Sequence, residues 1–315
     1  MFARVHAIHR LAACCTLLFA TASTVFAQPG GMEEINRRPD NIGTGAYPAM
    51  KEEVASLPAH VIYRPRDLAA LGNTKLGVVA WGNGGCSDDA ASSRFHLLEV
   101  ASHGYLVIAS GGIFSGPGAR QRPAQAPVAE GQQAPPRTTA EQLTQAIDWA
   151  LAENARPGSP YFGRISEDQI AVSGFSCGGI QALNVAGDPR IDTLVLMNTG
   201  IFNDGGPGMA GMEITKAALD TIHTPAIYIL GGETDIAYAN GMDDFRRISH
   251  VPVAVANLPV GHGGTYSQEN GGSAAQVAVN WLQWRLRGDQ EAAKMFVGSD
   301  CGLCRDAEWT LETKF

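Results

Sequence analysis

A serine lies in the pattern G-x-S-x-G directly after an apolar run that is typical of a buried strand. The run is Ile170-Ala171-Val172, and the motif is Gly174-Phe175-Ser176-Cys177-Gly178. At a tight strand-to-helix turn a serine projects its hydroxyl away from the backbone, and small flanking residues are needed because a Cβ would collide with the neighbouring strand or helix. The pattern predicts that Ser176 is a nucleophile. A chain with 37 glycines also contains such patterns by chance, so the rest of the sequence has to decide.

A serine hydroxyl is a poor nucleophile at neutral pH and requires a base that accepts its proton and an acid that orients the base. The acid and then the histidine are expected in loops after later strands. Asp235 follows the apolar run 226–230, and His262 is the only one of eight histidines that follows a strand at the required point. We therefore expect Ser176, Asp235 and His262 to form a catalytic triad. The alternatives are Glu233, Asp243 or Asp244 as the acid, and a turn residue at His262.

The attacked carbonyl oxygen becomes negative and requires hydrogen-bond donors, which are commonly backbone N–H groups. One expected donor is Cys177, at the start of a helix whose dipole favours negative charge. The other is Asn83, in the glycine-rich segment Trp81-Gly82-Asn83-Gly84-Gly85-Cys86 that follows an apolar run. This segment has neither G-x-G-x-x-G nor a terminal Lys-Ser/Thr pair, so a phosphate-binding loop is the weaker interpretation.

Cysteines lie beside both expected donors, which predicts a Cys86–Cys177 disulfide that clamps the two loops together. The alternative is that Cys177 is a small packing residue with a free thiol. Cys301-Gly302-Leu303-Cys304 forms a C-x-x-C pattern, for which a local disulfide is favoured over a redox pair or half of a metal site. No second C-x-x-C or H-x-x-H accompanies it, so we expect no metal and no organic cofactor.

Apolar runs alternate with helical patterns along most of the chain, which predicts an α/β fold with a mostly parallel central sheet and helices on both faces. Strands are expected at 60–63, 76–81, 106–110, 170–173, 193–197, 226–230 and 253–258. Helices are expected at 90–102, 139–153, 177–185, 214–221, 241–248 and 273–287. The expected divisions are a signal peptide at 1–27, a lead segment at 28–58, one domain at 59–290 and a tail with the Cys-x-x-Cys at 291–315.

The N-terminus has the pattern of a secretory signal. Arg4 and Arg10 precede an apolar stretch at 11–25, and Val25-Phe26-Ala27 is a small-x-small cleavage site. The stretch is short for a membrane span, so the mature chain is expected to carry no integral membrane segment and to lie in the periplasm or outside the cell. The net charge of −8 argues against nucleic-acid binding, which needs clustered lysine and arginine. We also expect a monomer.

Residues in loops after the expected strands are candidates for contact with a substrate. They are Ile113 and Phe114 after one strand, and Thr199, Ile201 and Phe202 after another, with ordinary loop packing as the alternative. Their apolar, uncharged character favours a neutral acyl or aryl group. The loop 111–137 is rich in Pro, Gln, Gly and Ala, and it is either a roof over the pocket or disordered in its middle.

With these residues in place, the chain resembles secreted α/β-hydrolase-fold esterases of the dienelactone-hydrolase, platelet-activating-factor-acetylhydrolase and cutinase-like polyesterase group. The matching segments are Gly174-Phe175-Ser176-Cys177-Gly178-Gly179, 101–108, Gly231-Gly232-Glu233-Thr234-Asp235 and Gly261-His262-Gly263, and the resemblance covers about 59–287. The chain departs from the group at Trp81, where histidine is usual, and in the cysteine-containing tail.

The resemblance implies a single α/β-hydrolase domain and a serine esterase that cleaves small-molecule or polymer-borne esters through an acyl-enzyme. The alternatives are an acyltransferase or amidase with the same triad, or a catalytically inactive binding module. The sequence leaves the natural ester open among short-chain esters, polyesters and acylated plant polysaccharides.

Overall fold

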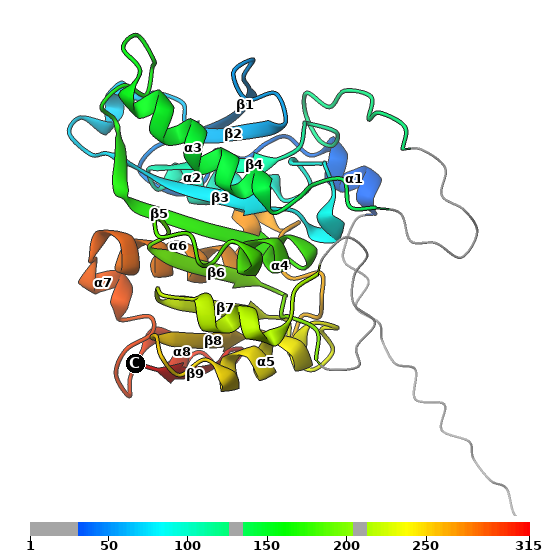
Figure 1. The fold of residues 1–315 in the computed structure, drawn as a ribbon, viewed down its shortest axis with the longest axis vertical. Coiled ribbons are helices and arrows are strands. Elements are labelled where there is room, and N and C mark those ends of the chain that lie inside the picture. The colour runs from blue at the N-terminus through cyan, green and yellow to red at the C-terminus, as the bar shows by residue number, and fades with distance from the viewer. Residues whose placement is uncertain (1–30, 126–134, 204–212) are drawn as a thin grey trace, which may run out of the picture.

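The computed structural model describes residues 31–125, 135–203 and 213–315. The expected signal peptide at 1–27 and the middle of the 111–137 loop lie outside these residues. Nine strands of the described residues form one sheet in the order β1-β2-β4-β3-β5-β6-β7-β8-β9 (Figure 1). The strands are β1 Ala49–Glu53, β2 His60–Pro65, β3 Leu76–Gly82, β4 Tyr105–Ser110, β5 Ile165–Phe175, β6 Thr193–Met197, β7 Ala226–Leu230, β8 Val253–Asn257 and β9 Thr310–Lys314.

Strands β4, β3, β5, β6, β7 and β8 are parallel, while β1, β2 and β9 join the sheet antiparallel. The helices of the described residues are α1 Met32–Arg37, α2 Arg94–Ser102, α3 Glu141–Ala155, α4 Cys177–Asn184, α5 Tyr238–Arg247, α6 Gly272–Arg287, α7 Gln290–Ala293 and α8 Gly302–Arg305. Short 3-10 helices are η1 Ala69–Leu71, η2 Gly84–Cys86, η3 Lys216–Thr221 and η4 Glu269–Gly271. The expectation of an α/β chain with a mostly parallel sheet is confirmed.

The sheet is buried on both faces by helices, which explains the continuous apolar runs of its central strands. Helices α2 and α6 contribute to a core on one face, with Leu97, Leu98 and Trp281 among its members. Helices α3, α4 and α5 contribute to a second core on the other face, with Ile147 and Phe245 among its members. Every residue of β3, β4, β6, β7 and β8 is buried.

Both edge strands of the sheet come from segments that the sequence analysis placed outside the domain. Strand β1 lies in the 28–58 lead, and β9 lies in the 291–315 tail. Neither was expected, because edge strands are partly solvated and do not form apolar runs: β1 is AMKEE and β9 is TLETK. The lead and tail therefore complete the sheet rather than flank it.

The strand order reverses at β3. The chain passes from β3 to β4 on one side, and then returns across β3 to β5 on the other side. Because α2, which follows β3, and α4, which follows β5, pack on opposite faces, the chain leaves these two neighbouring strands toward opposite sides of the sheet. The segments that carry Asn83 and Ser176 begin at this point.

Three expected helices differ from the structure by more than two residues or in helix type. The helix expected at 90–102 begins at Arg94, the one expected at 241–248 begins at Tyr238, and the one expected at 214–221 is the 3-10 helix Lys216–Thr221. In the part of the chain that the structure describes, no helix has the length and apolar character needed to cross a membrane.

The buried carboxylate of Glu99 connects the lead segment to two helices. It accepts hydrogen bonds from Thr44 N at 2.8 Å and from Gln276 Nε2 at 2.9 Å, and His103 Nε2 lies 3.1 Å away. Burial raises the pKa of Glu99, but the hydrogen bonds from His103, Thr44 and Gln276 outweigh it and lower the pKa to about 2. The ionised carboxylate therefore stabilises the folded chain.

We predict that Glu99→Gln lowers the free energy of unfolding at pH 7 by about 1–3 kcal/mol, the typical cost of disrupting hydrogen bonds to a buried charge. The folded pKa lies below the unfolded one, so the contribution is complete above the ordinary glutamate pKa and is lost as pH falls toward 2. Urea unfolding at several pH values should show the difference from wild type shrinking with acid. The exposed Glu291→Gln is the control, and an equal effect of both variants would contradict the assignment.

Candidate active site

Ser176 lies between the end of β5 and the start of α4, in a backbone conformation that few side chains adopt. Its φ is 53° and its ψ is −118°. A Cβ on Gly174 would overlap the backbone of Gly178, and a Cβ on Gly178 would overlap the backbone of Gly82. The two glycines of the motif are therefore required by close backbone packing on both sides of the turn.

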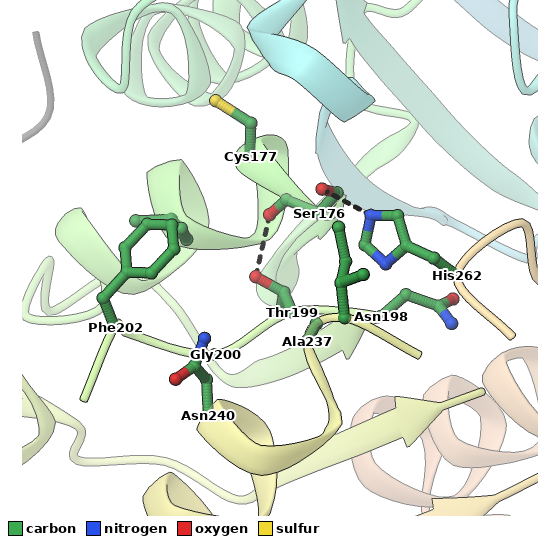
Figure 2. A pocket seen from close by; sticks show the side chains of 11 residues that line it. Ser176, Cys177, Asn198, Thr199, Gly200, Phe202, Ala237, Asn240 and His262 are labelled. Carbon is green, nitrogen blue, oxygen red and sulfur yellow. Dashed lines mark hydrogen bonds between the residues drawn. The ribbon is translucent and has the colours of Figure 1, made fainter. Parts of the chain in front are cut away.

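Ser176, His262 and Asp235 lie in a single hydrogen-bonded chain. The distance from Ser176 Oγ to His262 Nε2 is 2.9 Å, and that from His262 Nδ1 to Asp235 Oδ1 is 2.6 Å. Figure 2 shows the serine and the imidazole facing each other at the rim of a pocket. Since the carboxylate lies at Nδ1, the imidazole is oriented with Nε2 toward the serine hydroxyl, which is the arrangement of a base that accepts its proton.

The other acids considered from the sequence lie elsewhere. Glu233 is exposed, and Asp243 forms ion pairs with Lys216 and Arg247. Asp244 is buried against Lys216 and accepts a hydrogen bond from Ile201 N at 2.8 Å. None of these carboxylates is hydrogen-bonded to His262.

The carboxylate of Asp235 is 3% exposed and has hydrogen-bond donors at both oxygens. Ala237 N donates to Oδ1 at 2.9 Å, while Gly231 N and Asn198 Nδ2 donate to Oδ2 at 3.0 and 2.8 Å. Burial raises the pKa of Asp235, but the hydrogen bonds from His262, Ala237, Asn198 and Gly231 outweigh it and lower the pKa below its ordinary value. The acid is therefore ionised at neutral pH and fixed in orientation.

Asn198 and Tyr266 extend this chain, and the sequence analysis did not identify either. Asn198 follows β6 with a φ of 46° and is 3% exposed. Its amide donates to Asp235, and its Oδ1 accepts a hydrogen bond from the buried Tyr266 hydroxyl at 2.7 Å. The tyrosine therefore fixes which way the amide points. The available signal was a polar residue directly after the buried run 193–197, the same signal that identified Asp235 and His262.

The loop after β3 is held by the side chains of Trp81 and Asn83. Asn83 Nδ2 donates to the carbonyls of Ser87 at 2.8 Å and Ser110 at 2.6 Å, and its Oδ1 accepts from Trp81 Nε1 at 3.1 Å. The Asn83 backbone nitrogen lies beside the turn, 2.6 Å from where a Cβ on Gly178 would be. The N–H groups of Asn83 and Cys177 thus belong to two segments in direct contact, as two donors to one oxyanion must.

Both cysteine pairs favoured by the sequence lie at disulfide distance. The Cα atoms of Cys86 and Cys177 are 5.2 Å apart, and those of Cys301 and Cys304 are 4.9 Å apart. The first pair links η2 to the first residue of α4 across 91 positions of sequence, whereas the second closes a local turn in the tail. The long-range disulfide connects the two segments that carry the expected oxyanion donors.

A cavity of about 80 Å³ adjoins Ser176 and His262. Of the residues expected to contact a substrate, Thr199 and Phe202 line it together with Ile236 and Asn240 (Figure 2). Thr199 also donates a hydrogen bond to the Ser176 carbonyl at 2.7 Å. Ile201 is instead buried in the core.

Ile113 and Phe114, the other two residues expected to contact a substrate, are not among the residues that line this cavity. Strand β3 separates β4 from β5, so the loop after β4 begins one strand further from Ser176. Ile113 is largely buried, and the Phe114 ring packs under the guanidinium of Arg120 at 4.4 Å.

A serine, an imidazole and a buried carboxylate in this geometry can attack a carbonyl carbon through the serine oxygen. Within 31–125, 135–203 and 213–315, no group of three or more His, Cys, Asp or Glu residues is placed to hold a metal ion. A scan against protein-family models and a search of curated proteins found no match for this chain.

We predict that the double variant Cys86→Ala, Cys177→Ala slows covalent labelling of Ser176 by a fluorophosphonate about tenfold, because the two donor segments lose their fixed spacing. It should also lower the free energy of unfolding by about 2–4 kcal/mol, since the closed loop is long. Labelling rates and urea unfolding measure these effects. The matched control is Cys301→Ala, Cys304→Ala, which should leave the labelling rate unchanged. Equal rates for wild type and the first variant would show that the disulfide does not order the site.

We predict that Asn198→Ala slows the same labelling about tenfold, because one oxygen of Asp235 loses a donor in a buried site. Asn198→Asp should move the acid limb of the pH profile of the labelling rate to higher pH. An added negative charge beside Asp235 favours the protonated form of the Asp235–His262 pair. Tyr266→Phe should have a smaller effect of the same kind. Asn154 is buried on α3, where its Oδ1 accepts a hydrogen bond from Ile165 N at the far end of β5, and Asn154→Ala is the control for general destabilisation. A profile of Asn198→Asp that overlays that of wild type would contradict the positioning role.

Proposed function

We propose that this protein is a secreted serine hydrolase with an α/β-hydrolase fold that cleaves carboxylic esters. The observation that carries the proposal is the hydrogen-bonded chain from Ser176 through His262 to the buried Asp235. Three further features support it. They are the strained turn at Ser176, the parallel strands whose carboxyl ends lead to all three residues, and the resemblance in sequence to secreted esterases.

In the proposed first half-reaction, Ser176 Oγ attacks the ester carbonyl while His262 Nε2 accepts its proton. The carbonyl oxygen becomes negative and is stabilised by the N–H groups of Cys177 and Asn83. His262 then donates the proton to the leaving alcohol oxygen as its bond to the acyl carbon breaks. The products of this step are the free alcohol and an acyl group on Ser176.

In the second half-reaction a water molecule attacks the acyl carbon, and His262 accepts a proton from it. The collapse of this intermediate returns the proton to Ser176 and releases the carboxylic acid. Asp235 remains ionised throughout and stabilises the imidazolium that forms twice in the cycle. Its four hydrogen-bond partners, which lower its pKa, suit this role.

Export from the cytoplasm is part of the proposal. Two disulfides support it, because such bonds persist in oxidising compartments. The N-terminal pattern at 1–27 is the sequence basis for the same inference and lies outside the described residues.

We predict that Ser176→Ala abolishes hydrolysis of p-nitrophenyl acetate and fluorophosphonate labelling, with a loss of at least about 10³-fold in kcat because the nucleophile is gone. Circular dichroism should show an unchanged fold. Ser166 lies at the other end of β5 and donates to Asp168, so Ser166→Ala is the matched control and should keep full activity. Turnover by Ser176→Ala at the wild-type rate would refute the assignment.

The same assay separates the related reactions that this triad could perform. Added alcohols or amines compete with water for the acyl-enzyme, so formation of new esters or amides faster than hydrolysis would identify an acyltransferase. Cleavage of an anilide at a rate comparable to the ester would identify an amidase. Absence of both turnover and labelling in the wild-type protein would leave a binding module.

A further inference from the structure

A second and larger cavity is lined by residues adjacent in sequence to the catalytic ones, although neither Ser176 nor His262 lines it. Its volume is about 420 Å³, compared with about 80 Å³ for the cavity that Thr199 and Phe202 line. Three of its lining residues are chain neighbours of residues in the proposed site. Phe175 precedes Ser176, Gly84 follows Asn83, and Gly263 follows His262. A ligand there therefore lies beside the chain neighbours of the serine and the imidazole, and the Phe175 ring centroid is 5.2 Å from that of His262. Only the larger cavity falls in the range of about 300–1,000 Å³ that is typical of small-molecule sites.

Polar groups line much of the larger cavity, and two of them have unused hydrogen-bonding capacity. Ser93 is 3% exposed, and its hydroxyl has no partner among the residues that the structure describes. Asp89 Oδ1 accepts hydrogen bonds from Ala91 N at 3.1 Å and Phe114 N at 3.2 Å, whereas its Oδ2 has no partner within the described chain. Both residues line the cavity, where a ligand or water can complete their hydrogen bonding.

Two charged side chains, those of Asp89 and Arg122, line the larger cavity. Arg122 donates to Asp88 and, at 2.7 Å, to the Ser87 hydroxyl, and Arg137 Nη1 lies 3.2 Å from the other oxygen of Asp88. The charge of Arg122 is therefore paired with a carboxylate outside the lining. The hydroxyl, carboxylate and guanidinium groups of the lining offer donors and acceptors to a neutral polar ligand.

An aromatic ring forms the wall nearest the catalytic residues. Phe175 is half-buried, and its ring centroid lies 4.5 Å from that of Tyr266 and 5.2 Å from that of His262. Its ring also packs on Gly84, where a Cβ would overlap it. The cavity therefore combines an aromatic ring beside the imidazole and further apolar side chains, Met32 and Ile35 among them, with hydroxyl, carboxylate and guanidinium groups.

We propose that the larger cavity binds the alcohol part of the ester and that this part is a neutral, polyhydroxylated group, so that the substrates are carbohydrates carrying short O-acyl groups. The inference rests on the proposed function. The acyl group occupies the small, apolar cavity, where little more than a short chain fits. The sugar lies against Phe175, with hydroxyl groups toward Ser93 and Asp89, and its ester oxygen receives the proton from His262.

Three acetate esters that differ only in their alcohol test the proposal: an acetylated methyl xyloside, butyl acetate and acetylcholine. We expect the highest kcat/KM for the xyloside. Ser93→Ala should lower its kcat/KM about fivefold through loss of one hydrogen bond and leave butyl acetate within about twofold. Asp89→Asn keeps an oxygen for Ala91 and Phe114 and should act in the same direction. Ser115 is also buried, with an unpartnered hydroxyl, but does not line the cavity, so Ser115→Ala is the matched control.

The outcomes separate this proposal from the proposed function. Equal rates for the xyloside and butyl acetate, or equal losses on both in Ser93→Ala, would overturn the carbohydrate assignment and leave the esterase intact. A preference for acetylcholine that Asp89→Asn removes would overturn it in favour of a cationic alcohol. Absence of turnover on all three esters, together with absence of fluorophosphonate labelling, would refute the hydrolase itself.

Discussion

The close approach of two backbone segments, at Gly82 and at Gly178, is the constraint on which the rest of the site depends. No side chain fits between them, so β3 and the turn after β5 meet through main-chain atoms alone. This contact places the Asn83 amide beside the helix that begins at Cys177, and the Cys86–Cys177 disulfide holds the same two segments together. A preorganised pair of N–H groups needs this rigidity, because donors that must move into place stabilise a developing charge less.

A second constraint is the burial of Asp235, which is tolerated because each carboxylate oxygen has donors. The hydrogen bonds run from Tyr266 through Asn198 and Asp235 to His262 and Ser176. Five side chains from four loops therefore orient one another. The free-energy cost of burying such a network is small when every polar group has a partner, and large when one member is missing. Its completeness explains how an acid can stay charged in an apolar surrounding and still orient the imidazole.

The two cavities give the site an asymmetry that the catalytic residues alone do not have. Thr199 and Phe202 enclose a small, mostly apolar space, and Ser93, Asp89 and Phe175 line a larger, mixed one. Catalytic groups of this kind accept many esters, so selectivity arises from the shape and hydrogen-bonding demands of the two spaces. Under the proposed esterase function, the loops after β3 and β6 would therefore govern substrate choice as much as the triad governs reactivity.

The central parallel strands and the strand-end positions of Ser176, Asp235 and His262 could be predicted from the sequence, because buried strands and the polar residues that follow them leave local patterns. The two cysteine pairs were favoured for their positions, beside the expected donors and in a C-x-x-C pattern. The sequence did not reveal β1 and β9, whose solvated edges carry no apolar run. Three features became visible in the folded chain alone: Tyr266 bonds Asn198, which bonds Asp235; Phe114 packs against Arg120; and Ser93 lines the second cavity. These facts depend on which strands are neighbours, and strand order is set by packing between distant segments.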